Sequence, residues 1–309
     1  MPPVDRKDPQ RAKPSDSRYS LMDFMREFPN DDACLERLWR SRFSDDGEHA
    51  HCPKCDKQRS FKRYATKQRR QSWTCTACGH HIQPTAGTIF HKSSTSLVLW
   101  FYAGYLMTST KCGVSAKHLG RELGVTYKTA WRMLNKIRNE LMEQGDDVKL
   151  SGEVEVDETY IGGKQRFQFG RPGRTSKKTP VLAMTERGGK VVAKVIPDAS
   201  AKSLLPEIER HVEPGTQIYT DEWRGYASLH KLYPHRTVRH AHHEYVRGPV
   251  FTSTVEGFFG NVKNGIAGNY HGVSRKWLQG YLNEYAWRLN HRDEPRADFL
   301  TLLLRSARS

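Results

Sequence analysis

Apolar residues in the first half of the chain recur at helical spacing. A short helix is expected from Asp31, which is placed to cap its amino end, with apolar residues at 34, 35, 38 and 39. An apolar helix is predicted over 97–107, and two further helices over 114–142 with a break at Gly124. Between the first of these helices and the rest lies 51–90, a segment of modest apolar content that contains four cysteines.

From residue 153 onward, short apolar runs bounded by turn residues are typical of strands. Strands are predicted at 153–161, 181–185, 190–196, 216–221 and 236–239. A helix with Leu204, Ile208 and Val212 on one side is expected before the fourth strand, a short helix around 226–232 after it, and long helices after 252. This succession predicts an α/β fold of the ribonuclease-H-like kind: a mixed sheet with flanking helices, with acidic residues on adjacent strands and on a later helix.

The same patterns suggest how the chain is divided. A Pro-rich polar leader, expected to be disordered, covers 1–20, and a polar stretch at 144–147 separates the two halves. The predicted units are a leader (1–20), an amino-terminal helix with a zinc ribbon (21–92), a helical region with a helix-turn-helix (93–145), a ribonuclease-H-like catalytic domain (150–295) and a tail (296–309).

Composition narrows the class of partner. The 309 residues include 50 Lys and Arg against 34 Asp and Glu, a net charge of +16 that favours a polyanion, with nucleic acid first and an anionic membrane surface a distant second. No apolar run approaches 18 residues, and the first twenty residues do not resemble a signal peptide. We therefore expect a cytoplasmic, nucleoid-associated protein that binds DNA and does not enter a membrane.

Four of the six cysteines form two Cys-x-x-Cys pairs, Cys52 with Cys55 and Cys75 with Cys78, separated by 19 residues. This spacing predicts a structural Zn²⁺ site, and four thiolates leave no open position for catalysis. The alternative is four incidental thiols. Cys34 and Cys112 have no such partners and are expected to be buried apolar side chains.

Basic residues gather in three places that suggest contacts with DNA. The loop between the cysteine pairs is rich in Lys and Arg and either lies on phosphates or is a solvated charged loop. The segment 114–138 looks like a helix-turn-helix whose second helix would face a major groove, although a helical hairpin that serves only packing has a similar pattern. A basic hairpin is expected at 162–178. The predicted DNA contacts are Lys62, Arg63, Arg69, Arg70, Thr126, Tyr127, Lys128, Arg132, Arg171 and Arg174.

Three carboxylates are candidates to hold catalytic Mg²⁺ or Mn²⁺. Asp157 lies in a half-buried strand, Asp221 ends the fourth strand and Glu256 lies on a helical pattern. Hard oxygen ligands suit these ions, which can activate an attacking hydroxyl and stabilise a departing oxygen in phosphoryl transfer. Most acidic residues are solvated surface charges, and this is expected for Glu153, Glu155 and Glu158.

Lys263 and a group of five histidines are the remaining basic candidates. Lys263 stands two helical turns from Glu256 and is a candidate phosphate contact. Five histidines between 230 and 243 are more typical of phosphate-facing or structural residues than of a metal site.

Several motifs together resemble the transposases of the IS1595 group of insertion sequences, also described as ISXO2-like transposases. They accompany the cysteine pairs and run from Phe28 to Cys34, Val156 to Lys164, Thr220 to Glu222, Glu244 to Arg247, Val255 to Phe259, Gly268 to Ser274 and Glu284 to Arg292. One departure is Ser253, where relatives commonly have Asn.

The resemblance implies a DDE-type transposase with Asp157, Asp221 and Glu256 as metal ligands, assisted by Lys263 and His240. Such enzymes bind the terminal inverted repeats of their element, cut there and join the freed 3′ hydroxyl to target DNA, usually as homo-oligomers. Two alternatives stay open. One is a DNA-binding regulator that has lost strand transfer, and the other is a ribonuclease-H-like nuclease specific for branched DNA.

Overall fold

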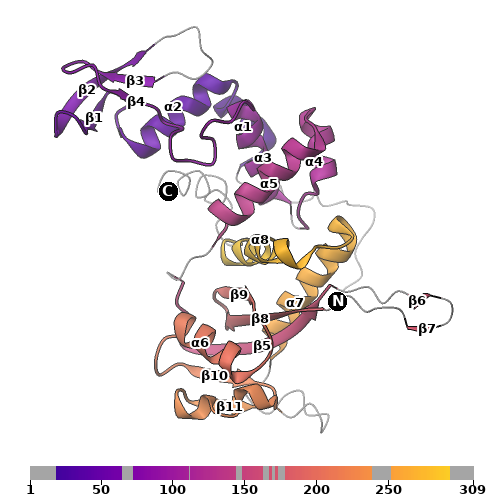
Figure 1. Cartoon of the computed structure of the whole chain (residues 1–309). Coiled ribbons are helices and arrows are strands. Elements are labelled where there is room, and N and C mark those ends of the chain that lie inside the picture. Colours follow the sequence, from indigo (N-terminus) through magenta and orange to yellow (C-terminus); the bar gives the residue numbers. More distant parts are fainter. Residues whose placement is uncertain are drawn as a thin grey trace, which may run out of the picture.

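The computed structural model describes residues 19–64, 72–110, 112–143, 148–162, 167–168, 171–172, 178–238 and 252–292 (Figure 1). The predicted tail and all but the last two residues of the predicted leader lie outside these ranges. Within them, no helix has both the length and the apolar content that crossing a membrane requires.

Three helices open the described chain: α1 (Leu21–Glu27), α2 (Asp31–Arg42) and α3 (Leu97–Ser109). The predicted cap of α2 is displaced by one residue, because the Asn30 side chain accepts the capping hydrogen bond from the Ala33 amide. Asp31 serves α3 instead and accepts hydrogen bonds from the Ser96 hydroxyl and the Val98 amide. It thereby ties α2 to a helix more than 60 residues away in the sequence.

Between α2 and α3 the chain forms a four-stranded antiparallel sheet in sequential order. Its strands are β1 (His49–Cys52), β2 (Lys57–Tyr64), β3 (Ser72–Cys75) and β4 (His81–Ile82). The sheet packs on α2 through stacked indoles, since the rings of Trp39 and Trp73 lie 4.9 Å apart and nearly parallel. Both side chains are buried, so this small sheet shares a core with the helices that flank it.

The next two helices, α4 (Ala116–Leu123) and α5 (Tyr127–Lys136), are separated at the predicted position. Gly124 ends α4 with φ of 64°, a left-handed conformation that glycine adopts at little cost. Ala130 and Leu134 are fully buried, as the apolar pattern predicts. After Lys136 the helix continues as one π-helical segment, Ile137–Leu141.

The second half contains a five-stranded mixed sheet of order β11-β10-β5-β8-β9. Its strands are β5 (Glu153–Ile161), β8 (Thr179–Glu186), β9 (Val191–Val195), β10 (Gln217–Thr220) and β11 (His235–Thr237). Strands β5, β8 and β9 pair antiparallel, whereas β10 runs parallel to β5 and β11 runs parallel to β10. All five lie close to their predicted positions. A short hairpin, β6 (Phe167–Gln168) with β7 (Arg171–Pro172), projects from the β5–β8 connection (Figure 1).

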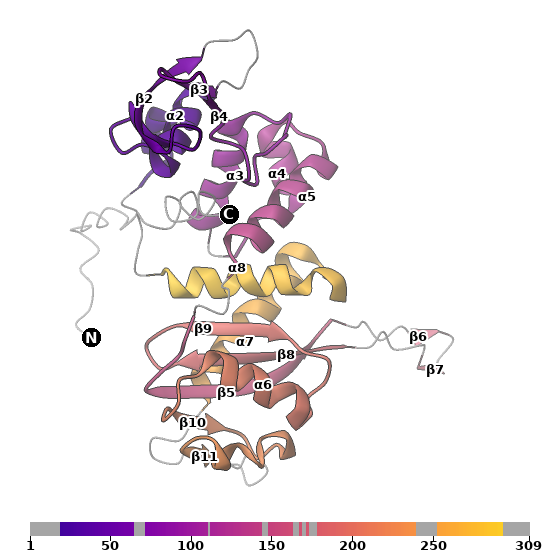
Figure 2. The same cartoon turned by 60° about the vertical axis from the view of Figure 1, so that its left-hand side comes forward.

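Helices cover both faces of this sheet (Figure 2). They are α6 (Ala201–His211) on one face, and α7 (Ser253–Gly265) and α8 (Leu278–Asn290) on the other. Alternate residues of β8 serve the two layers: Leu182 and Met184 pack toward α6, and Val181 and Ala183 pack toward α7 and α8. The result is a three-layer mixed α/β structure. The predicted short helix after β10 is two 3₁₀ turns, Arg224–Tyr226 and Leu229–Lys231.

Helix α8 lies between the two halves of the molecule and is buried on both sides (Figure 2). Leu282 packs toward the sheet, whereas Trp287 joins the core of the amino-terminal half. At this junction the Arg138 guanidinium, 3% exposed, donates to the fully buried Glu284 carboxylate at 2.6 Å. Burial alone would raise the pKa of Glu284, but Arg138 and Arg288 outweigh it and lower the pKa.

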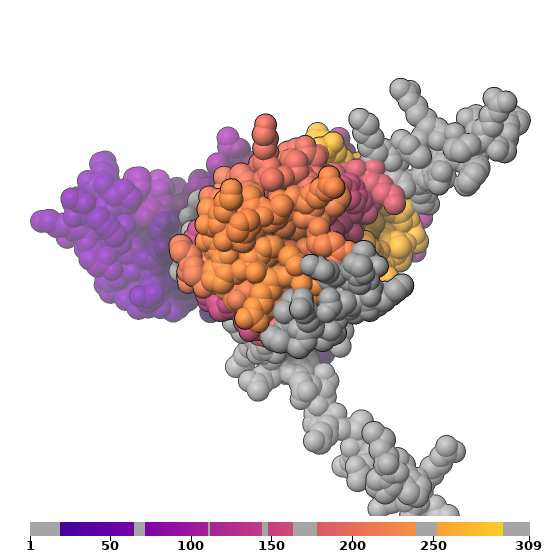
Figure 3. All heavy atoms as spheres, turned by 90° about the horizontal axis from the view of Figure 1, so that it is seen from below, coloured from indigo at the N-terminus to yellow at the C-terminus, as the bar shows by residue number. Residues whose placement is uncertain are grey.

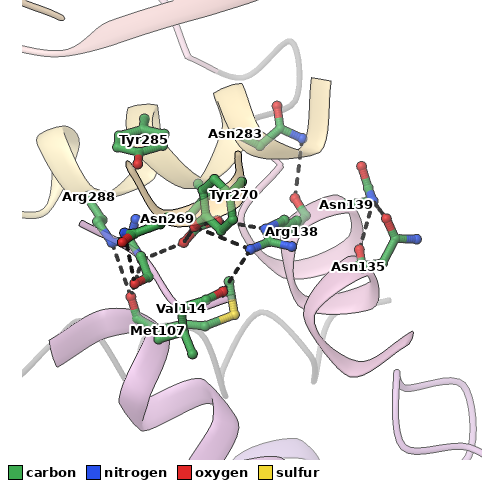
Figure 4. A network of polar contacts seen from close by, with 12 residues as sticks. Met107, Val114, Asn135, Arg138, Asn139, Asn269, Tyr270, Asn283, Tyr285 and Arg288 are labelled. Carbon is green, nitrogen blue, oxygen red and sulfur yellow. Dashed lines mark hydrogen bonds and ion pairs between the residues drawn. The ribbon is translucent and has the colours of Figure 1, made fainter. Parts of the chain in front are cut away.

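Further contacts close this junction (Figure 4). The Arg138 guanidinium lies 4.1 Å from the centre of the Tyr281 ring and also donates to the Val114 carbonyl. From α8, the Asn283 amide donates to the Arg138 carbonyl, and the Arg288 guanidinium donates to the Met107 carbonyl at the end of α3. The two halves are therefore joined by paired buried charges as well as by apolar packing.

Candidate active site and metal centre

Asp157 and Asp221 lie on neighbouring parallel strands. The observed register places Tyr219 of β10 beside Glu155 of β5. Both strands rise by the same amount per residue, so extending this register by two residues brings Asp221, which follows the last residue of β10, beside Asp157. Both side chains are partly buried. Figure 3 shows that the orange part of the chain, which contains β10 and β11, forms much of the surface at this end of the molecule.

Glu256 lies in the first turn of α7, which packs on β5 and β8, and its side chain is exposed. Burial, followed by the carboxylates of Asp221, Glu158 and Glu256, raises the pKa of Asp157 to about 7. Asp221 and Glu256 therefore both disfavour the charged form of Asp157, although among the described residues only the four cysteines have their ligand atoms gathered as a metal group.

This arrangement suits a hard divalent cation. Carboxylate oxygens are the ligands that Mg²⁺ and Mn²⁺ prefer, and a positive ion would offset the burial and the neighbouring carboxylates that raise the pKa of Asp157. The Asp221 carboxylate is oriented by a hydrogen bond from the Trp223 amide, and the Thr252 hydroxyl donates to Glu256. The donor set and its electrostatics fit the ions that the sequence predicts.

Asp157→Asn is expected to stabilise the protein at alkaline pH when no Mg²⁺ or Mn²⁺ is added. The folded state keeps the Asp157 proton up to about pH 7, whereas the unfolded chain releases it near 3.8, so stability falls as pH rises between these values. The substitution removes this loss. The melting temperature should exceed that of wild type by roughly a few degrees at pH 8 and by little near pH 4.

Asp198→Asn is the matched control, because hydrogen bonds from Ser200 lower the pKa of Asp198 below its ordinary value. Its effect on the melting temperature should be the same at pH 8 and pH 5. An Asp157→Asn protein that melts no higher than wild type at pH 8 would show that Asp157 is not under electrostatic strain.

The prediction that Glu153, Glu155 and Glu158 are solvated surface charges is wrong for two of them. Glu155 is fully buried, and Glu158 is partly buried and accepts a hydrogen bond of 2.6 Å from the Tyr226 hydroxyl. Glu153 is exposed but pairs with Arg187 at 2.7 Å. The sequence contains a signal for the burial of Glu155. Glu155 and Asp157 are two residues apart and so lie on the same face of a strand expected to be half buried.

Lys263 and His240 are the residues predicted to assist the three carboxylates. Lys263 is exposed near the end of α7, two turns beyond Glu256, and its ammonium lies 5.9 Å from the centre of the Phe259 ring. His240 lies outside the described residues. His230 is exposed, and burial lowers the pKa of the partly buried His235.

The four cysteines of the two pairs converge as the spacing predicts. Their Sγ atoms all lie within 4.8 Å of one another, and those of Cys52 and Cys78 are 3.6 Å apart. A tetrahedral zinc with bonds of 2.3 Å would place its sulfurs about 3.8 Å apart, so the cluster is compatible with structural zinc.

Two similar turns build this cluster. In one the Asp56 amide donates to the Cys52 carbonyl, and in the other the Gly79 amide donates to the Cys75 carbonyl. Asp56 and Gly79 both have positive φ. Of the remaining cysteines, Cys34 is buried as predicted, but Cys112 is exposed, which contradicts the prediction. Cys112 lies in the connection between α3 and α4. Its backbone carbonyl accepts a hydrogen bond from the Tyr285 hydroxyl.

On β2, one predicted DNA contact is exposed and the other is engaged in an ion pair. Lys62 is exposed, whereas the Arg63 guanidinium pairs with Asp32 at 2.5 Å and lies over the Trp73 ring. Arg69, Arg70 and Arg174 lie outside the described residues, and Arg171 is described only as part of strand β7.

At the start of α5, all four predicted DNA contacts are exposed: Thr126, Tyr127, Lys128 and Arg132. Tyr127 is 62% exposed although it is a large apolar side chain. The hydroxyl of Thr126 accepts from the Thr129 amide and caps the helix. Its first role is therefore structural.

Comparison with known proteins gives this geometry a context. Residues 149–290 match the sequence model of the ISXO2-like transposase domain. A relative from Halobacterium salinarum, described as an uncharacterized protein in transposable element ISH50, is 28% identical over 276 residues, which cover 83% of this chain and 91% of the relative. A protein from Haemophilus influenzae, described as an uncharacterized transposase-like protein, is 27% identical over 103 residues, or 33% of this chain and 82% of the relative.

These matches support a transposase. More narrowly, the chain carries an ISXO2-like transposase domain of the IS1595 family over residues 149–290, and the resemblance inferred from its motifs is confirmed.

Proposed function

We propose that the protein is a DDE-type transposase that binds the terminal inverted repeats of an insertion sequence and catalyses metal-dependent strand cleavage and strand transfer. The observation that supports the proposal is the placement of Asp157 and Asp221 on paired parallel strands, with Asp221 and Glu256 among the carboxylates that, after burial, raise the pKa of Asp157. Three antiparallel strands followed by two parallel ones, with acidic residues on adjacent strands and on a later helix, support the ribonuclease-H-like assignment.

In this proposal the three carboxylates hold one or two Mg²⁺ or Mn²⁺ ions. When bound, such ions activate the attacking hydroxyl and stabilise the departing oxygen of an in-line phosphoryl displacement. The side chains set the geometry: Asp157 and Asp221 from paired strands and Glu256 from a helix packed on them. Lys263 on the exposed side of α7 contacts a phosphate, and His240 assists as the family resemblance implies.

The amino-terminal half recognises the DNA ends. The cysteine cluster and its four-stranded sheet act as a zinc ribbon, with Lys62 as a phosphate contact. Helices α4 and α5 act as a helix-turn-helix, with Tyr127, Lys128 and Arg132 toward the major groove. The basic β6–β7 hairpin, which carries Arg171, adds a further contact, and the protein works as a homo-oligomer on end and target DNA.

The direct test is cleavage of the element's own ends, which are found as short inverted repeats flanking the gene. Purified protein with Mg²⁺ should nick these ends, and Asp157→Asn should reduce the rate at least about 100-fold while the ends are still bound. Glu209→Gln, which changes an exposed carboxylate on the opposite face of the sheet, is the matched control and should cleave normally.

The outcome separates the main alternatives. Wild-type protein that binds the ends but leaves them intact, as Asp157→Asn does, would be a DNA-binding regulator. Preference for four-way junctions over linear ends would indicate a structure-specific nuclease.

A further inference from the structure

Glu155 is a buried carboxylate that lies on strand β5 and accepts hydrogen bonds from helix α7. Its side chain is fully buried. It accepts four hydrogen bonds, from the Thr254 amide at 2.8 Å, the Val255 amide at 3.2 Å, the Thr254 hydroxyl at 3.0 Å and the Arg187 guanidinium at 2.9 Å. Three of these four donors lie in the first turn of α7.

These contacts replace an ordinary helix cap. The free amides of the second and third residues of a helix are usually satisfied by the side chain of the residue just before it. In α7 that residue is Thr252, whose hydroxyl bonds to Glu256 and makes no capping bond among the described residues. The cap comes instead from Glu155, about a hundred residues earlier in the chain.

The charge of Glu155 is compensated at both ends. Burying a carboxylate is costly unless it is paired and hydrogen-bonded. The positive end of the α7 dipole stabilises it on one side, and the Arg187 guanidinium stabilises it on the other. Arg187 is itself fixed, because it pairs with Glu153 and lies 4.1 Å from the centre of the Tyr219 ring.

The position of Glu155 links it to the predicted metal ligands. It precedes Asp157 by two residues in the same strand, so both side chains lie on one face of β5. The amides that it binds belong to the two residues immediately before Glu256. One rigid connection therefore joins the strand that carries the first carboxylate to the helix turn that carries the third.

We propose that Glu155 is a positioning residue that docks the first turn of α7 on β5 and so holds Glu256 beside Asp157 and Asp221. Glu155 does not bind the metal ion, since its carboxylate is occupied by α7 and Arg187. This inference rests on the proposed function, because it assumes that the three carboxylates share a divalent cation.

Iron-mediated backbone cleavage tests the proposal without measuring transposition. Fe²⁺ replaces Mg²⁺ in the full-length protein, and ascorbate with peroxide then cuts the backbone close to the bound iron. Wild type should be cut near residues 157, 221 and 256. In Glu155→Ala the cut near 256 should weaken at least about tenfold relative to the other two, since two or more charge-assisted hydrogen bonds that dock α7 are lost.

Two variants separate positioning from general stability. Glu155→Gln keeps an oxygen that can accept the α7 amides and should recover most of the cut near 256. Ile208→Ala, a core substitution in α6 on the other face of the sheet, should lower the melting temperature but leave the ratio of the three cuts unchanged. If Glu155→Ala does not melt cooperatively, Glu155→Asp, which is too short to reach both amides, replaces it with the same expectation.

Equal cutting at all three places in Glu155→Ala or Glu155→Asp would overturn the positioning role while leaving the metal site intact. Loss of all three cuts in those variants would also overturn it, because the effect would not be specific to Glu256. The absence of cuts near all three carboxylates in wild type would instead remove the proposed function, and this inference with it.

Discussion

Removal of the proposed zinc ion from the cysteine cluster is expected to unfold the small sheet formed by β1 to β4. The strands are four, eight, four and two residues long, and their buried apolar side chains, Cys52 and Cys75 apart, are only Ala50, Phe61, Trp73 and Ile82. A core of this size rarely folds alone, whereas zinc binding to four thiolates contributes on the order of 10 kcal/mol. The Cys75→Ser variant should therefore bind less zinc and expose residues 49–82 to proteolysis.

Cys112→Ser is the matched control, because Cys112 is exposed and lies in the connection between α3 and α4, outside the sheet. It should keep its full zinc content and its protease resistance. Zinc content is measured by atomic emission and cleavage by mass spectrometry. A Cys75→Ser protein with the same protease pattern as wild type would mean that the sheet is held by packing on α2 alone.

Breaking the ion pair between Arg138 and Glu284 is expected to destabilise the protein by about 3 to 5 kcal/mol, because it leaves a buried charge without its partner. The Glu284 carboxylate also accepts from Arg288 and from the Tyr270 hydroxyl, so Glu284→Leu leaves three donors unsatisfied. Urea denaturation of the full chain measures the change in the free energy of unfolding.

The control is an exposed pair of the same chemistry. Arg40 and Glu36 pair at 3.0 Å with side chains 47% and 37% exposed, so Glu36→Gln should cost less than about 1 kcal/mol. The double variant Arg138→Met with Glu284→Leu should recover part of the loss. If Glu284→Leu and Glu36→Gln cost the same, the buried pair does not stabilise the junction.

The element pattern of this chain could be predicted well from its sequence, because local periodicity decides it. The strand at 153–161 is found at those residues, and the break at Gly124 is where the glycine adopts positive φ. The cysteine cluster was equally accessible, since two Cys-x-x-Cys turns determine where the sulfurs point.

Contacts between residues far apart in the sequence could not be predicted from local periodicity. Arg138 and Glu284 are 146 residues apart, and Glu155 and Val255 are 100 apart, so no local pattern connects them. The sequence predicts that Glu155 is a surface charge, because lone acidic residues usually are. Its burial becomes understandable only when α7 and Arg187 are seen to supply its hydrogen bonds.

The candidate active site lies between these cases. Periodicity predicts that Asp157 lies on a strand, but its closeness to Asp221 depends on the parallel pairing of β5 with β10, two strands separated in sequence by a hairpin, two further strands and a helix. The local settings of these three acids make them candidates, and the resemblance to known transposases implies that they bind one metal site together.

The central claim is that Asp157, Asp221 and Glu256 bind a divalent cation together. Crystals of the full-length protein grown with Mn²⁺ test this most directly, through the anomalous signal of the manganese. We predict a peak within coordination distance, about 2.2 Å, of carboxylate oxygens from all three residues, and its loss in Asp221→Asn. A map with no peak among these carboxylates at saturating Mn²⁺, or with a peak that persists in Asp221→Asn, would contradict the account.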